Sequence, residues 1–228
     1  NTPDFINIEG MEDRDVHTLF FWDKNDKFIA TIISIGCTAQ EVEGRNAINA
    51  DLFHPVREKL KKQYGQDLVI LGWISAAGDQ SPRPMYRKAA EERMMKLRNL
   101  TRLEELARRV VNAVDEIYET VKNDKYEDIK LIHQVETFTL PGRKVKPVEY
   151  EFAKSERDKY AKQIEEDPKS ADQLLGRMTW NNDIVRRYEM QKTEPDPQYK
   201  AKIHILRIGD VAVCTNPFEL FTDFGLRI

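Results

Sequence analysis

Two segments of the chain are almost continuously apolar, and they limit the folds it can adopt. Residues 28–35 read Phe-Ile-Ala-Thr-Ile-Ile-Ser-Ile, and residues 68–75 read Leu-Val-Ile-Leu-Gly-Trp-Ile-Ser. β-Branched and aromatic side chains at this density predict strands that are buried on both faces. Between the two segments, Asp51 is placed to cap a helix over residues 53–64. Because strands and helices alternate here, the expected fold is a layered α/β domain.

The remaining pattern predicts further strands and a long helix. Residues 17–23 and 28–36 flank a polar run at 24–27, which is typical of a β-hairpin. Thr101 and Glu104 have the spacing of a capping box and precede an apolar repeat of three and four residues. This repeat predicts a long amphipathic helix. Further strands are expected at residues 130–140, 201–208 and 210–215.

Charged residues dominate the segment from Val148 to Gln191, which predicts a helical excursion on the surface. The sequence contains no internal repeat. We therefore expect one layered, mixed-sheet α/β domain over residues 1–228, with the excursion at 148–191 inside it. The sequence starts on Asn1 and ends at Ile228 close to an apolar run, so we expect a piece of a longer protein, truncated at both ends.

Composition excludes several classes of protein. A hydrophobic fraction of 40% is sufficient for a core, and a net charge of -3 removes the broad attraction that nucleic-acid binders need. No uncharged apolar stretch of the sequence approaches the roughly 18 residues of a transmembrane helix. Cys37 and Cys214 are too few for a disulfide framework. We expect a globular chain that binds no nucleic acid and has no transmembrane segment.

A serine lies just beyond the second apolar segment, where α/β proteins bind ligands beside free helix amides. The run from Ser75 to Pro82 has the composition of a tight strand-to-helix turn. Amides at such a turn can hold an oxyanion, which makes Ser81 a candidate catalytic residue. The alternative is a turn at Gly78-Asp79 followed by a helix that Ser81 caps and Pro82 begins. The Gly-x-Ser-x-Gly elbow of many hydrolases is absent from this turn.

Three other candidate residues each have a functional and a purely structural interpretation. His54 follows Asp51 by one helical turn, so it is either a base held by a carboxylate or an ordinary half-buried histidine. Cys37 ends an apolar strand and is either a ligand, a nucleophile or a small buried hydrophobe. Glu219 stands between Phe218 and Leu220 and is either a metal ligand or a helix-start residue favoured by the dipole. No two histidines have the spacing of zinc ligands on one helix or strand.

Three segments of the chain match, in order and composition, the motifs of a single known family. Gly78-Asp79-Gln80-Ser81-Pro82 is similar to Gly-Asp-Val-Ser-Pro-Asn around a nucleophilic serine. The segment from Leu206 to Arg227 is similar to a Leu-Arg-Ile-Gly strand followed by Pro-Gly-Glu-Phe and Gly-Arg-Arg. Within residues 32–51, Cys37-Thr38-Ala39-Gln40 takes the place of His-Pro-Val-Ser, and Asp51 that of Ser-Ser-Asp. Together they resemble the neutral/alkaline, non-lysosomal ceramidase family, most closely its bacterial branch.

The resemblance implies a hydrolase that cleaves N-acyl amide bonds, of sphingolipids or of other small-molecule or lipid amides. Ser81 would attack the amide carbonyl or position the attack, and Asp79 would orient the loop. Gln80 and Arg83 replace the family's Val and Asn and imply a more polar pocket mouth, where they would bind substrate together with Gly78. The family also implies an exported protein, either periplasmic or extracellular.

The resemblance further implies a zinc cofactor that polarises the carbonyl and lowers the pKa of a bound water or of the serine. Glu219 corresponds to a zinc ligand of the family, and Cys37 stands where the family has a histidine. A thiolate binds zinc but makes it a weaker Lewis acid. The family's other histidine and its tyrosine would come from segments before Asn1 and after Ile228.

Three hypotheses follow from these residues. The first is an amide hydrolase that uses the Ser81 loop and zinc. The second, favoured by Cys37, is a family member that has lost catalysis and binds a lipid or glycan in the same pocket. The third is a serine hydrolase in which His54 activates Ser81 without a metal, which requires the two side chains within hydrogen-bond reach.

Overall fold

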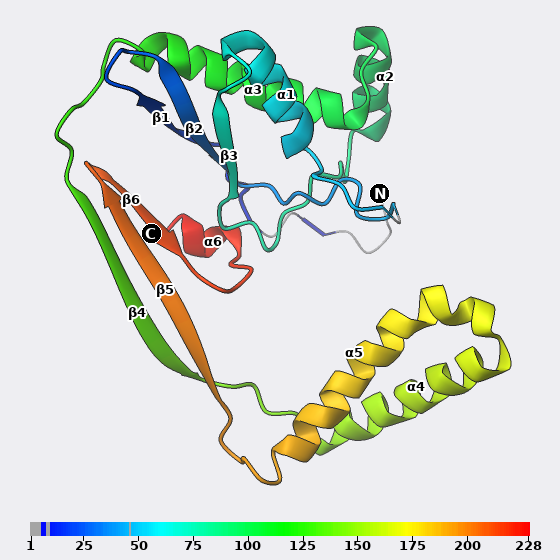
Figure 1. Ribbon diagram of the computed structural model, residues 1–228. Coiled ribbons are helices and arrows are strands. Elements are labelled where there is room, and N and C mark those ends of the chain that lie inside the picture. The colour runs from blue at the N-terminus through cyan, green and yellow to red at the C-terminus, as the bar shows by residue number, and fades with distance from the viewer. Residues whose placement is uncertain (1–5, 8–9, 46) are drawn as a thin grey trace. The chain divides into compact units, whose positions relative to one another are not determined.

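The protein is a mixed α/β chain that divides into two compact units, shown in Figure 1. The computed structural model describes residues 6–7, 10–45 and 47–228. The first unit comprises the residues up to Asp128 together with Phe218–Ile228, and the second comprises Ile129–Pro217. Each unit contains one three-stranded sheet.

The sheet of the first unit has the strand order β1-β2-β3. Strands β1 (Val16–Trp22) and β2 (Phe28–Ile35) are antiparallel neighbours, which confirms the predicted hairpin. Strand β3 (Val69–Ile74) runs parallel to β2, with Ala30 opposite Val69 and Ile35 opposite Ile74. Because β2 and β3 are parallel, the loops that follow them leave the sheet at the same edge.

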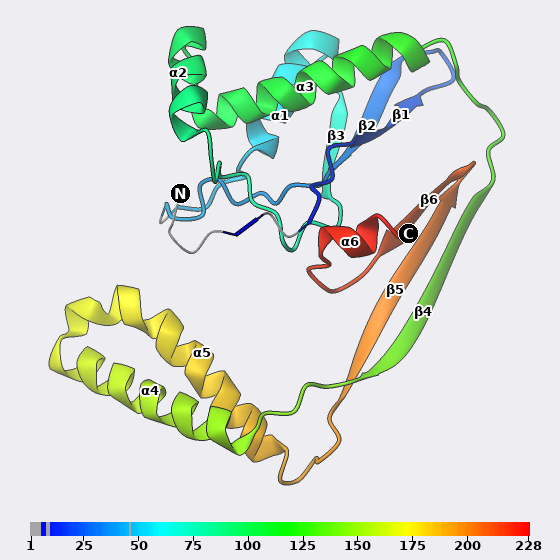
Figure 2. The ribbon, with the colours of Figure 1, turned by 180° about the vertical axis from the view of Figure 1, so that it is seen from behind.

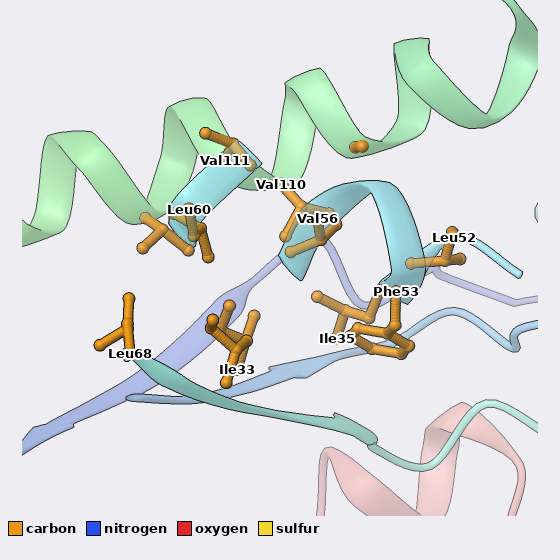
Figure 3. Close-up of a cluster of buried hydrophobic side chains, with 12 residues drawn as sticks. Ile33, Ile35, Leu52, Phe53, Val56, Leu60, Leu68, Val110 and Val111 are labelled. Carbon is orange, nitrogen blue, oxygen red and sulfur yellow. The ribbon is translucent and has the colours of Figure 1, made fainter. Parts of the chain in front are cut away.

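Two helices cover one face of this sheet and form its core. Helix α1 (Phe53–Tyr64) and helix α3 (Arg102–Val121) lie on the same side of the strands in Figure 2. Their apolar side chains meet those of β2 and the start of β3, as Figure 3 shows for Val56, Leu60 and Ile33. The prediction of a long amphipathic helix in this part of the chain is therefore confirmed.

The two apolar strands are not buried on both faces, contrary to the prediction. In β2 the residues at alternate positions, Thr31, Ile33 and Ile35, are buried and their neighbours are only half-buried. In β3 the exposed fraction of Val69 is 61%. The physical reason is the layering within this unit, because the helices cover one face and β3 is an edge strand. Apolar density alone does not separate a strand covered on one face from one covered on two.

Asp51 does not cap α1, although it lies next to the cap. The helix begins at Phe53, its N-cap position is Leu52, and no side chain caps it. The buried Asp51 carboxylate instead accepts hydrogen bonds from the amides of Val42 at 2.9 Å and Leu52 at 2.7 Å. Its φ of 47° lies in the left-handed region that Asp tolerates better than most residues. Asp51 therefore closes the loop after β2 against the start of α1.

The start of α3 carries the predicted capping box, which is confirmed. Thr101 Oγ1 accepts a hydrogen bond from the amide of Glu104, and the Glu104 carboxylate accepts one from the amide of Thr101 at 2.7 Å. One residue further on, the fully buried carboxylate of Glu105 accepts hydrogen bonds from three arginines, Arg98, Arg108 and Arg109. These hydrogen bonds lower the pKa of Glu105 to about 2 against the effect of burial, with Arg108 as the main cause.

The Glu105 cluster predicts acid-sensitive stability. Since the folded pKa lies below the ordinary value of 4.5, its contribution is present above about pH 4.5 and is lost as the pH falls toward 2. With allowance for screening at the partly exposed arginines, we expect Glu105→Gln to lower the free energy of unfolding at pH 7 by about 2 kcal/mol. Urea unfolding at pH 7 and pH 3 measures this. An unchanged pH dependence in the variant would contradict it.

The second unit contains the predicted helical excursion and the three later strands. Helix α4 (Pro147–Glu166), the short helix η1 (Pro168–Ser170) and helix α5 (Ala171–Met190) form a hairpin in which Tyr150 stacks on Tyr188 at 4.3 Å between ring centroids. Strands β4 (Leu131–Pro141), β5 (Gln198–Ile208) and β6 (Val211–Thr215) form an antiparallel sheet. The turn between β5 and β6 is at Gly209, whose φ of 61° suits glycine.

Candidate functional site

The candidate site is the edge of the first sheet where β2 and β3 both end. The amide of Ser75, the first residue after β3, donates to the Ile35 carbonyl at 3.0 Å and so continues the pairing to this edge. Beyond it, Thr38 Oγ1 donates to the carbonyl of Gln80 at 3.4 Å, which joins the loop after β2 to the loop after β3. The two loops that carry Cys37 and Ser81 are therefore held beside each other.

Ser81 is exposed and does not cap a helix. Helix α2 (Lys88–Arg98) begins seven residues later, so the alternative in which Ser81 caps a helix that Pro82 begins is wrong. Ser81 Oγ accepts a hydrogen bond from the amide of Arg83 at 3.3 Å. This local turn, together with the hydrogen bond from Thr38 to Gln80, keeps the hydroxyl at the surface beyond the end of β3.

Arg83 spans the two loops. Its Nη2 donates to the carbonyl of Gln40 at 3.0 Å and to Glu43 Oε1 at 2.5 Å. Arg83 also lines a cavity of about 290 Å³ that reaches the start of α3 at Thr101 and Arg102. The lining carries both signs of charge, since Glu41 lies on the same wall, and it also includes the apolar Val42 and Leu103. Its charged side chains offer partners to the polar part of a ligand.

The C-terminal segment packs directly against the serine loop. The Gly78 amide donates to the carbonyl of Leu220 at 2.8 Å, and the backbone of Glu219 lies where a side chain at position 78 would be. On the other side, a Cβ at Gly225 would lie 2.7 Å from the Cβ of Ala76. Both glycines are therefore required by close approach rather than by a turn.

Asp79 binds this segment through one residue, Thr222. The amide and the Oγ1 of Thr222 both donate to Asp79 Oδ1 at 2.8 Å. The hydrogen bond from the Thr222 amide is the main reason that the pKa of Asp79 is lowered, so the carboxylate is ionised at neutral pH. Gln80 Nε2 in turn donates to Thr222 Oγ1 at 3.1 Å. The side chains of Asp79 and Gln80 thus hold the loop against the C-terminal segment, although Asp79 is exposed.

Cys37 and Glu219, the two candidate zinc ligands, do not form a ligand set. Burial raises the pKa of the half-buried Cys37 thiol, with Arg102 opposing it, so the group stays protonated at neutral pH. The thiol lies 3.6 Å from the carbonyl of Thr38. Glu219 is exposed. Across the described part of the chain, neither residue belongs to a group of three or more donors close enough to share an ion.

A different donor cluster, formed by Asp13, Asp15 and His17, lies at the N-terminal end of β1. One donor atom from each residue lies within 4.8 Å of the others. Ser75 Oγ donates to Asp13 Oδ2 at 3.4 Å, and a Cβ at Gly36 would be 2.8 Å from Asp13, so the cluster borders the same sheet edge. This cluster was not among the sites predicted from the sequence. Its signal is the spacing of two, which puts the three side chains on one side of an extended segment.

His54 is the second residue of α1 and is exposed. Among the residues that the structure describes, no hydrogen bond joins its ring to Ser81, so the serine–histidine hypothesis gains no support. His133 and His204 form a pair of their own in the second unit, where His133 Nε2 lies 2.9 Å from His204 Nδ1. They bridge neighbouring strands of that sheet and were not predicted to meet.

Comparisons with known proteins assign no family to the chain. No family model, no curated protein and no solved structure matches it. A separate search of the described helices found none that is both long enough and apolar enough to cross a membrane.

Proposed function

We propose that the chain acts on N-acyl amides through the loop of Gly78–Arg83, as the resemblance to the ceramidase family implies. The observation that carries the proposal is the setting of Ser81, an exposed hydroxyl just beyond the paired ends of two parallel strands. Loops at this edge are the usual ligand sites of open α/β sheets. The hydrogen bonds on both sides of the loop fit a preorganised reactive group rather than a mobile surface turn.

In this proposal Ser81 is the reacting group. Its Oγ attacks the amide carbonyl, the C–N bond breaks as the serine proton passes to the leaving amine, and water then hydrolyses the resulting ester to the carboxylic acid and restores the hydroxyl. In the alternative, Ser81 orients the water that attacks the carbonyl directly. Asp79 Oδ1 accepts two hydrogen bonds from Thr222, and these lower the pKa of the carboxyl group, so its role is to hold the loop and not to take the serine proton. Arg83 and the cavity beside it would bind the polar part of the substrate.

The zinc that the resemblance implies does not fit the residues carried over for it. Zinc sites need three or four donors, and thiols bind zinc as thiolates. Cys37 is a half-buried thiol with a raised pKa, and among the described residues neither Cys37 nor Glu219 belongs to a group of three donors close enough to share an ion. We therefore assign no catalytic step to a metal held by this pair.

The lack of an assembled zinc site around Cys37 and Glu219, among the described residues, favours a second candidate function, which is binding without catalysis. A chain that keeps the loop but lacks an assembled donor set would still present the cavity and the exposed hydroxyl to a lipid or glycan. The two functions share the site and differ only in turnover.

An assay with a short-chain fluorescent ceramide separates the two functions. We expect the 228-residue chain to release the fatty acid, and the rate with added zinc and with a chelator shows whether a metal takes part. Binding of the ceramide without release would move the function to the second candidate. Neither binding nor release, with either sphingolipid or simple N-acyl amides, would contradict both.

A further inference from the structure

Thr222 lies at the centre of the contacts between the serine loop and the C-terminal segment. It is 1% exposed, although its neighbours Phe221 and Asp223 are exposed. Its hydroxyl donates to Asp79 at 2.8 Å and accepts from Gln80 at 3.1 Å. A buried hydroxyl that makes both kinds of hydrogen bond is costly to replace by an apolar group, since its partners are then left unpaired.

The partners of Thr222 are the two residues directly before Ser81. Asp79 is bound twice, by the amide and the hydroxyl of Thr222, and Gln80 is bound by its side chain. Gln80 is also fixed at its carbonyl by Thr38. The backbone that leads into Ser81 therefore has one anchor in the loop after β2 and one in the C-terminal segment, 142 residues further along the chain.

A simpler role for these bonds is the capping of helix α6 (Thr222–Gly225) by Asp79. Capping explains the hydrogen bond from the Thr222 amide to Asp79, because Thr222 is the first residue of α6. Capping does not explain the hydroxyl, which α6 does not need, or the hydrogen bond from Gln80 to it. It also does not explain why Gly78 and Gly225 both permit close approach of the two segments. These features join the serine loop to the C-terminal segment in ways that capping alone does not require.

We infer that Thr222 is a positioning residue for Ser81, acting through Asp79 and Gln80. The inference rests on the proposed function for its effect on turnover. Its effect on the order of the loop does not depend on that function. Because misplacement of a reacting group by about 1 Å costs on the order of 100-fold in rate, loss of this anchor should appear in kcat more than in KM.

The test compares Thr222→Val, which keeps the shape and the amide but removes the hydroxyl, with Thr222→Ser, which keeps the hydroxyl. Thr120→Val, at an exposed position of α3, is the control. Amide hydrogen exchange is read at Gly78 and Gln80, whose amides bond to Leu220 and Ala77. The Ser75 amide, bonded to Ile35 in the sheet, reports whether the fold is intact.

In Thr222→Val we expect exchange at Gly78 and Gln80 to rise about 5- to 30-fold, with Ser75 unchanged, since the two hydrogen bonds of the hydroxyl, to Asp79 and from Gln80, are lost at about 0.5 to 1 kcal/mol each. With a short-chain ceramide as substrate, kcat should fall about 10- to 100-fold with KM nearly constant. Thr222→Ser should restore both. Unchanged loop exchange in Thr222→Val, or loss in Thr222→Ser equal to that in Thr222→Val, overturns the inference. If the unsubstituted chain shows no turnover, the proposed function fails while loop exchange still decides the role of Thr222.

Discussion

Replacing Ser81 with alanine is expected to reduce release of fatty acid from a short-chain ceramide by about 1,000-fold or more, as loss of a nucleophile does in other hydrolases. Ser81 is exposed and, within the described part of the chain, its Oγ has one hydrogen bond, from the Arg83 amide, so the substitution leaves no buried group there unpaired. Stability should change by no more than about 0.5 kcal/mol. Initial rates and urea unfolding of the same preparations measure both effects.

Ser155→Ala is the matched control for this prediction. Ser155 is an exposed serine of α4 in the second unit and lies outside the candidate site. Its replacement should leave the rate unchanged. Equal rates for the Ser81 variant and the unsubstituted chain would remove Ser81 from the chemistry, while equal losses in both variants would point to the preparation rather than to the site.

Replacing Leu60 with alanine is expected to lower the free energy of unfolding by about 3 kcal/mol. Leu60 is fully buried in α1, between the sheet and α3, and the close-up in Figure 3 shows it among Val111, Leu68 and Ile33. Truncation removes apolar contacts and leaves a cavity that neighbours on three elements cannot all fill. Urea unfolding of Glu58→Ala, an exposed position of the same helix, is the control. A loss for Leu60→Ala no larger than that of the control would contradict the assigned core.

The sequence was informative where a local signal has one structural meaning. The capping box of Thr101 and Glu104 predicts the start of α3, and the polar run at 24–27 between apolar segments predicts the hairpin of β1 and β2. Both signals depend on residues close in the chain. Predictions failed where layering decides: one face of β3 is exposed because the helices of this unit cover only the other face, which apolar density does not report.

The candidate site also has parts that the sequence predicts and parts that it does not. The position of Ser81 beyond the end of β3 follows from the apolar run before it, and the strand is found there. The partner of Asp79 could not be predicted from spacing, because Thr222 is 143 residues away and nothing in its local sequence marks it as buried. Asp51 shows the reverse case. Its spacing fits a helix cap, but its carboxylate binds the amide of Val42 in the preceding loop.

Chemical-shift mapping tests most directly whether the loop of Gly78–Arg83 is the functional site. The probe is a short-chain ceramide in which a urea replaces the amide, so that binding is read without turnover and both proposed functions are covered. The account predicts amide shift changes that concentrate at Gly78–Arg83 and at Cys37–Glu43, with the α4–α5 hairpin unchanged. Saturable shift changes confined to the hairpin or to the second sheet, or no saturable change at all, would contradict it.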